Sequence, residues 1–115
     1  MDILFNSDKD RELANSQQKL EKKYQGNPNR IKLIRSRLDL LRDISNLAMI
    51  RNFPQANCHE LKGNRKGQFA VKLDKGYRLI FESANNPIPQ KSDGGLDWNK
   101  ITAIKILSLA EDYHD

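Results

Sequence analysis

Cysteine is almost absent from this chain, and that limits its chemistry. The 115 residues include a single cysteine, Cys58, so no disulfide can form within the chain. A lone thiol is typical of proteins from a reducing compartment, and we expect a cytoplasmic location. No Cys-x-x-Cys or His-x-x-x-His pattern occurs, and such spacings are typical of zinc sites. We therefore expect neither a metal nor another cofactor.

Long hydrophobic runs are also missing. The longest apolar stretches fall far short of the roughly 20 residues that span a bilayer, and mean hydropathy is -0.77. The chain turns charged directly after Ile3-Leu4-Phe5, so we expect no signal peptide and no membrane association. No Gly-x-Ser-x-Gly or Gly-x-Gly-x-x-Gly motif is present, so two common enzyme signatures are excluded.

Positive charge is present in excess and is concentrated. The net charge is +5, and the segment from His59 to Arg78 holds six cations and two anions. A concentrated positive face attracts polyanions such as nucleic acid. The same charges could equally form an ordinary solvated surface, or bind an acidic partner protein.

The first half of the chain has helical periodicity. Ile3-Leu4-Phe5 predicts a short strand, and Ser7 with Asp10 resembles a capping box that opens a helix running to about Gln25. Gly26-Asn27-Pro28 interrupts that helix and starts another. The second helix has an apolar stripe, with four arginines expected away from it. The stripe comprises Ile31, Ile34, Leu38 and Leu41, and the arginines are Arg30, Arg35, Arg37 and Arg42.

The second half changes to a period of two, which is typical of strands. Phe69, Val71 and Leu73 alternate with more polar residues, and Asp74-Lys75-Gly76 predicts a turn into a partner strand, 77–82. A polar surface loop is expected over 83–99, then a strand over 101–107. We expect one α+β domain over 1–115, in which a short strand and a helical hairpin pack on one face of a small antiparallel sheet.

Two features of the second half could bind phosphate. Lys62 and Arg65 flank Gly63 in an expected tight turn, where glycine lets backbone N–H groups approach a ligand. Arg78 is expected on the open side of the sheet, opposite in direction to Tyr77 and Leu79 along the strand. There it could clamp a phosphate with two hydrogen bonds, or form an ion pair with Glu60, Glu82 or Asp112; the pattern leaves both open.

The chain contains two histidines, His59 and His114, and histidine is the side chain best suited to proton transfer near neutral pH. Cleavage of RNA by its own 2′-hydroxyl needs a base, an acid and cations, and no metal. Each histidine also has a structural alternative: a hydrogen bond beside Cys58, or a place in a frayed tail. A metal site from Cys58, His59, Asp112 and His114 is disfavoured, because adjacent residues of a strand project to opposite faces.

Three segments in order resemble a known family. They are His59-Glu60-Leu61-Lys62-Gly63-Asn64-Arg65-Lys66-Gly67, Tyr77-Arg78-Leu79-Ile80-Phe81 and Asp112-Tyr113-His114. They resemble the HigB-type toxins, the killer proteins of plasmid maintenance systems within the RelE-like superfamily. The resemblance spans roughly 31–114.

The resemblance implies a metal-free, ribosome-dependent endoribonuclease that cuts translated mRNA. It implies a helix-turn-helix, HigA-like antitoxin as partner, through which the pair would bind operator DNA. It also implies a set of site residues. Those proposed as catalytic are His59, Lys62, Arg78, Tyr113 and His114, and those proposed to contact RNA or phosphate are Arg65, Lys66 and Asp112.

Within that set, we expect the two histidines to transfer protons and Lys62 and Arg78 to stabilise the charged transition state. Four departures from the family pattern stand out: Asn64 where aspartate is frequent, the longer N-terminal helix, the longer 83–99 segment, and Asp115 after the terminal histidine. The alternative function is a non-catalytic basic module that binds RNA or the ribosome on the same fold.

Overall fold

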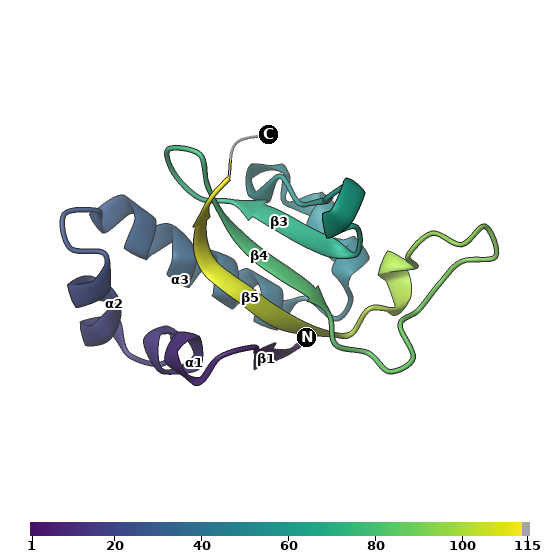
Figure 1. Ribbon diagram of the computed structural model, residues 1–115, viewed down its shortest axis with the longest axis horizontal. Helices are drawn as coiled ribbons and strands as arrows, with labels where there is room; N and C mark the ends of the chain where they lie inside the picture. Colours follow the sequence, from purple (N-terminus) through teal and green to yellow (C-terminus); the bar gives the residue numbers. More distant parts are fainter. Residues whose placement is uncertain (114–115) are drawn as a thin grey trace.

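The computed structural model describes residues 1–113 and has an α+β fold (Figure 1). A first strand, β1 (Asp2–Phe5), precedes the helices α1 (Asp8–Ala14), α2 (Gln17–Lys23) and α3 (Pro28–Asp43). The later strands are β2 (His59–Glu60), β3 (Gln68–Lys72), β4 (Tyr77–Ser83) and β5 (Ala103–Asp112). The predicted class, with helices before most of the sheet, is confirmed. None of the helices in the described chain has the length and apolar character needed to cross a bilayer.

The sheet is mixed, which corrects the expectation of a purely antiparallel one. Its strand order is β1-β5-β4-β3-β2. β1 runs parallel to β5, with Ile3 opposite Ile104, and the other pairs are antiparallel. Whether two strands pair parallel or antiparallel depends on the connection between them. The alternation of apolar and polar residues within β1 does not indicate the direction of pairing.

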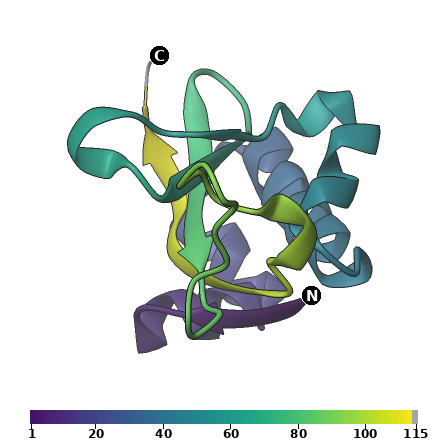
Figure 2. The ribbon, with the colours of Figure 1, turned by 90° about the vertical axis from the view of Figure 1, so that its right-hand side faces the viewer.

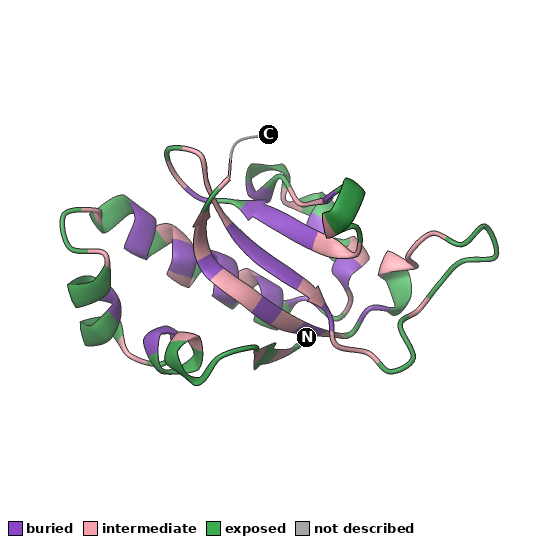
Figure 3. Cartoon of the chain, viewed as in Figure 1, coloured by how far each residue is buried: buried purple, intermediate pink, exposed green. Residues whose placement is uncertain are grey.

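The helices cover one face of this sheet (Figure 2). Residues of α3 on the side that faces the strands are buried (purple in Figure 3). Their side chains belong to the same core cluster as the inward residues of the sheet. Phe69 and Phe81 lie at the centre with rings stacked at 5.4 Å, and the Trp98 ring contacts Phe69 edge-on at 5.2 Å. Trp98 therefore packs onto the core, as is usual for an aromatic residue at the end of such a loop.

The long first helix predicted to reach Gln25 is instead two short helices. Ser7 caps α1 by accepting from the Asp10 amide at 3.1 Å, as predicted. Ser16 then caps α2 in the same way, through the Lys19 amide at 3.2 Å. A second capping serine ends the first helix because its side chain satisfies the amides of a new one. The hairpin is thus formed by α2 and α3, joined by a turn at Gly26 with φ of 85°.

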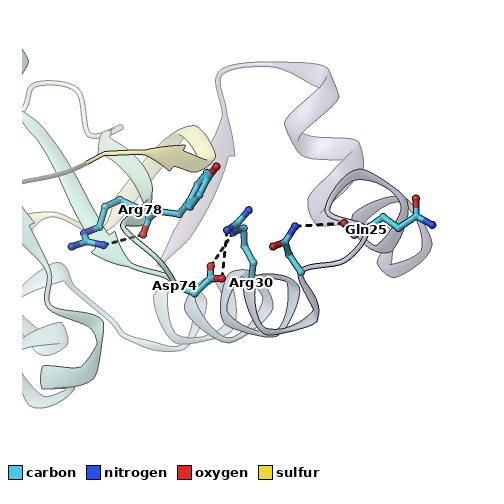
Figure 4. A network of polar contacts seen from close by, with 6 residues as sticks. Gln25, Arg30, Asp74 and Arg78 are labelled. Atoms are coloured by element: carbon cyan, nitrogen blue, oxygen red, sulfur yellow. Dashed lines mark hydrogen bonds and ion pairs between the residues drawn. The ribbon is translucent and has the colours of Figure 1, made fainter.

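Two of the four α3 arginines are buried, which corrects the prediction that all four lie away from the core. Arg30 donates to Asp74 of the β3–β4 turn at 2.9 Å, with 8% and 9% of the two side chains exposed (Figure 4). Its guanidinium also lies 3.6 Å from the centre of the Tyr77 ring. Arg37 donates to the carbonyl oxygens of Lys72 and Gln55 at 2.9 and 3.1 Å. Arg30 therefore joins α3 to the β3–β4 turn, and Arg37 joins α3 to the end of β3 and to the segment before β2.

The last strand is longer than predicted, and the loop before it is more ordered. β5 continues to Asp112 rather than ending at Leu107, with register shifts opposite Ile80. Within the expected loop, Gln90 pairs with Leu96 across a tight turn, and a 3-10 turn covers Trp98–Lys100. We call residues 84–100 the β4–β5 excursion. It projects from one end of the sheet, beside the start of β3 (Figure 1).

Candidate functional site

The face of the sheet opposite the helices carries a small apolar cluster among polar groups. Ala70 is paired with His59 on one side and with Ile80 on the other, so the three side chains share this open face. Ala70 and Ile80 are fully buried together with Leu61, and Leu107 and Tyr113 pack against them. These apolar side chains are buried although they lie on the face away from the helices, and the polar residues of this face are arranged around them.

The basic segment 62–67 forms a loop that projects from this face. The Leu61 amide donates to the Gln68 carbonyl at 2.8 Å and closes the loop. Gly63 and Gly67 have φ values of 66° and 94°, a region that residues with a side chain rarely adopt. The Gly67 amide donates to Glu60 Oε2 at 3.1 Å. This geometry confirms the glycine turn and leaves Lys62 and Lys66 exposed.

Arg65 links the basic loop to the end of β5. Its Nη2 donates to Glu111 Oε1 at 3.0 Å, and its Nη1 donates to the other oxygen of the same carboxylate. Its Nε donates to Gln68 Oε1 at 2.9 Å, and its guanidinium lies 5.4 Å from the Tyr113 ring centre. The hydrogen bonds that Arg65 donates to the Glu111 carboxylate raise the pKa of Arg65. Because all three nitrogens have protein partners, Arg65 positions the loop and Tyr113.

Arg78 lies on β4 between two charged register neighbours. It is paired with Lys72 of β3 and with Glu111 of β5, so the three side chains emerge on the open face. Its Nη1 donates to the Tyr77 carbonyl at 3.0 Å, and the side chain points away from Arg30, to the other side of the strand (Figure 4). The predicted position of Arg78 on the open face is therefore confirmed. Lys72 and Glu111 were not predicted as site residues.

The backbone hydrogen bond of His59 identifies the donor nitrogen of its ring. His59 Nδ1 lies 3.1 Å from the carbonyl oxygen of Asn57. A carbonyl oxygen can only accept, so Nδ1 is the donor in this hydrogen bond. His59 is half-buried on the edge strand β2, which β3 and β4 separate from β5, the strand that leads to Tyr113.

The last described residues, Asp112 and Tyr113, lie on different faces of the sheet. The Tyr113 amide donates to the Gly76 carbonyl at 3.1 Å, which holds its ring beside Arg65. Asp112 is exposed and is paired with Tyr77, whose ring lies under Arg30 on the helix side. Its register thus directs Asp112 to the face opposite Arg78. His114 lies outside the described residues.

Among residues 1–113, no three His, Cys, Asp or Glu side chains gather in a way that could hold a metal ion. Cys58 packs at the edge of the helix-side core. Burial raises the pKa of its thiol from an ordinary 9.0 to about 12, so at neutral pH it is a neutral thiol rather than a nucleophilic thiolate.

We expect Cys58 to react slowly with alkylating agents. Iodoacetamide at pH 8 should modify the native thiol more than about tenfold slower than a small free thiol, because the reactive thiolate is scarce. The rate should still rise between pH 9 and pH 11, since the pKa is about 12. The folded pKa exceeds the unfolded one, so the neutral thiol contributes its full stability below about pH 9 and loses it toward pH 12. Mass spectrometry of samples quenched at set times measures the rate of alkylation at each pH, and urea-unfolded protein is the control. A rate that levels off near pH 8 would contradict it.

The chain matches a known protein family. Residues 6–92 match a family model, the HigB-like toxin, described as the RelE-like toxin of the type II toxin–antitoxin system HigB. No curated protein and no solved structure matches the chain. The matched region contains the helices, the basic loop, β3 and β4, and stops before β5. It covers well over half of the 115 residues. The chain therefore belongs to the HigB-like family of RelE-like toxins from type II toxin–antitoxin systems.

Proposed function

We propose that this toxin is a metal-independent endoribonuclease that cleaves mRNA on the translating ribosome. The observation that carries the proposal is the open face of the sheet, where His59, Arg78 and Tyr113 surround one apolar cluster beside the basic loop. Family membership supports it, since toxins of this kind are generally endoribonucleases. Lys62 and Lys66 extend the positive face along the loop and supply further contacts for phosphate.

In the proposed reaction, the 2′-oxygen of one nucleotide attacks the adjacent phosphorus. The O2′–P bond forms and the P–O5′ bond breaks, giving a 2′,3′-cyclic phosphate and a 5′-hydroxyl. His59 accepts the proton from the 2′-hydroxyl at Nε2, because its Nδ1 hydrogen is held by the Asn57 carbonyl. His114 returns a proton to the departing O5′.

Two cations stabilise the charge that develops on the phosphate in this step. Arg78 offers a planar pair of donors that matches two phosphate oxygens. Lys62 adds a point charge from the rim of the loop. Arg65 is committed to Glu111, so its part is to hold the loop and the Tyr113 ring in place for stacking on a base. Asp112 remains a proposed RNA contact that would have to act from the other face of β5.

The partners follow from the same family membership. A type II system implies a protein antitoxin. We propose that it is a small HigA-like protein with a helix-turn-helix, which carries the pair to operator DNA, and that both act in the cytoplasm. A reading frame for such a protein next to that of this chain would support this.

The chemistry at the RNA ends tests the proposal. We expect induced expression to arrest bacterial growth, and purified toxin added to ribosomes on a defined mRNA to give fragments with 2′,3′-cyclic phosphate and 5′-hydroxyl ends. Ends with 3′-hydroxyl and 5′-phosphate would indicate metal-assisted hydrolysis and contradict the mechanism. Salt-sensitive ribosome or RNA binding without any cleavage would favour the non-catalytic module.

A further inference from the structure

A small pocket lies next to the candidate site, between the basic loop and the β4–β5 excursion. It has a volume of about 170 Å³. Its floor is Gln68 of β3 and Glu82 and Ser83 of β4, and its rim includes Lys66 and Gly67. The excursion supplies the far wall through Ile88 and Leu96. Pockets for drug-sized ligands measure about 300–1,000 Å³, so this one suits a single ring system.

The excursion forms a fixed wall. Its outer turn is closed by hydrogen bonds from the Lys91 amide to the Gly95 carbonyl at 2.7 Å and from the Asp97 amide to the Pro89 carbonyl at 3.0 Å. At its base, the Asn85 side chain donates to Thr102 Oγ1 at 2.9 Å and accepts from the Thr102 amide at 3.0 Å. A pocket whose wall is held from both ends is formed before a ligand arrives, which lowers the cost of binding.

The floor of the pocket presents a hydrogen-bond acceptor beside a donor. Gln68 and Glu82 are direct register partners, so their side chains stand next to each other on the open face. Gln68 Oε1 accepts from Arg65 Nε, so its Nε2 is the donor side of the amide. Glu82 offers a carboxylate, of which Oε1 lies 3.7 Å from the Lys105 ammonium. Ile88, 50% exposed, and Leu96 give the apolar surface against which a flat ring can pack.

We propose that this pocket binds one guanine of the RNA and selects the messages that the toxin cuts, an inference that rests on the proposed function. The guanine edge carries two adjacent donors, N1–H and N2–H₂, and an acceptor, O6. The carboxylate of Glu82 accepts from the donors, and the Gln68 amide donates to O6. Adenine and cytosine each place a ring-nitrogen lone pair where a guanine donor would be, against the carboxylate. Uracil has a single N–H between two carbonyl oxygens.

The position of the pocket suits a base near the cleaved bond. Gln68 touches the pocket and also binds Arg65, which holds Glu111 and lies beside Tyr113. One guanidinium therefore separates the proposed base pocket from the proposed stacking residue. Lys66, exposed at the rim, is placed to contact the backbone of the nucleotide that enters.

Mapping of cleavage sites on translated mRNA tests this inference. Wild-type toxin should cut with guanine enriched at one fixed position relative to the cut, and Glu82→Gln should lower that enrichment by about tenfold, as expected for loss of one base-specific pair of hydrogen bonds. Ile88→Asp should lower it too. Lys105→Gln keeps the carboxylate and should retain the preference, as should Leu4→Ala, a matched change at a side chain 51% exposed on β1.

The outcomes separate this inference from the proposed function. Cutting without a guanine preference, or an unchanged preference in Glu82→Gln, would overturn the pocket assignment and leave the ribonuclease standing. If the wild-type toxin cuts nothing, a binding experiment tests the pocket. Guanosine and adenosine monophosphates are titrated into the protein, and the NMR shifts of the Ile88 methyl groups are followed. Selective, Glu82-dependent shifts with the guanine nucleotide would support the pocket, and equal or absent shifts would overturn it.

Discussion

Replacing Arg78 with alanine is expected to slow mRNA cleavage by about a hundredfold to a thousandfold, the usual loss when a preorganised charge-stabilising donor is removed. The arginine lies on the open face between the register positions of Lys72 and Glu111, beside the buried apolar cluster. Single-turnover rates on ribosomes with a defined mRNA measure the effect, and the loss should be in the rate constant more than in binding.

Two further variants identify the cause of that loss. Arg78→Lys keeps the charge and removes the planar fork, so it should recover only part of the rate if the contact is bidentate. Arg42→Ala removes an exposed arginine from the end of α3 and should leave the rate unchanged. A folded Arg78→Ala protein that cuts within about threefold of wild type would exclude Arg78 from the reaction. The remaining candidates for the phosphate clamp would then be Lys62 and Lys72.

Replacing Asp74 with alanine is expected to lower the free energy of unfolding by about 3–5 kcal/mol, because it leaves Arg30 charged and buried without its partner. The Arg30–Asp74 pair has 8% and 9% of its side chains exposed, so water cannot readily take the place of the carboxylate. Urea unfolding at pH 7, followed by circular dichroism, measures the change. Since domains are typically stable by about 5–15 kcal/mol, this one substitution could remove much of the total.

A matched carboxylate elsewhere provides the comparison. Asp93 is 70% exposed and lies 3.9 Å from Lys91, so Asp93→Ala should cost less than about 1 kcal/mol. The double variant Arg30→Met with Asp74→Leu removes both charges and should recover most of the loss. An Asp74→Ala protein as stable as Asp93→Ala would mean that the buried ion pair contributes nothing to holding α3 on the β3–β4 turn.

The spacing of apolar residues predicted most of the fold. The predictions that were wrong concern positions that were assigned by residue type instead of by spacing. The stripe Ile31, Ile34, Leu38, Leu41 is buried as expected. Arg30 lies four residues before Ile34, and Arg37 lies three residues after it, so both fall on the buried face of the helix. They were nevertheless assigned to the surface because they are charged. Their partners, the Asp74 carboxylate and the backbone carbonyl oxygens of residues 55 and 72, are distant in sequence. A pattern within one helix holds no information about them.

The sequence predicted those features of the candidate site that lie within one short segment. It did not predict the contacts between segments that are distant in sequence. Glycines flanking cations indicated the loop, and alternation indicated the open face for Arg78. The bond between Arg65 and Glu111 joins residues 46 positions apart and could not be read from either segment. The register shifts opposite Ile80 likewise change which β5 residues share a face with Arg78.

The strand order has a consequence for when the sheet can be completed during synthesis. β5 comes last in the described sequence, yet it lies between β1 and β4. During synthesis, β1 has no strand to pair with, and Arg65 has no Glu111, until β5 has left the ribosome. A nascent chain therefore carries its cations without the frame that aligns them. Contacts so far apart in sequence also form slowly. The cations of the open face are therefore aligned only after the chain has been synthesised through β5.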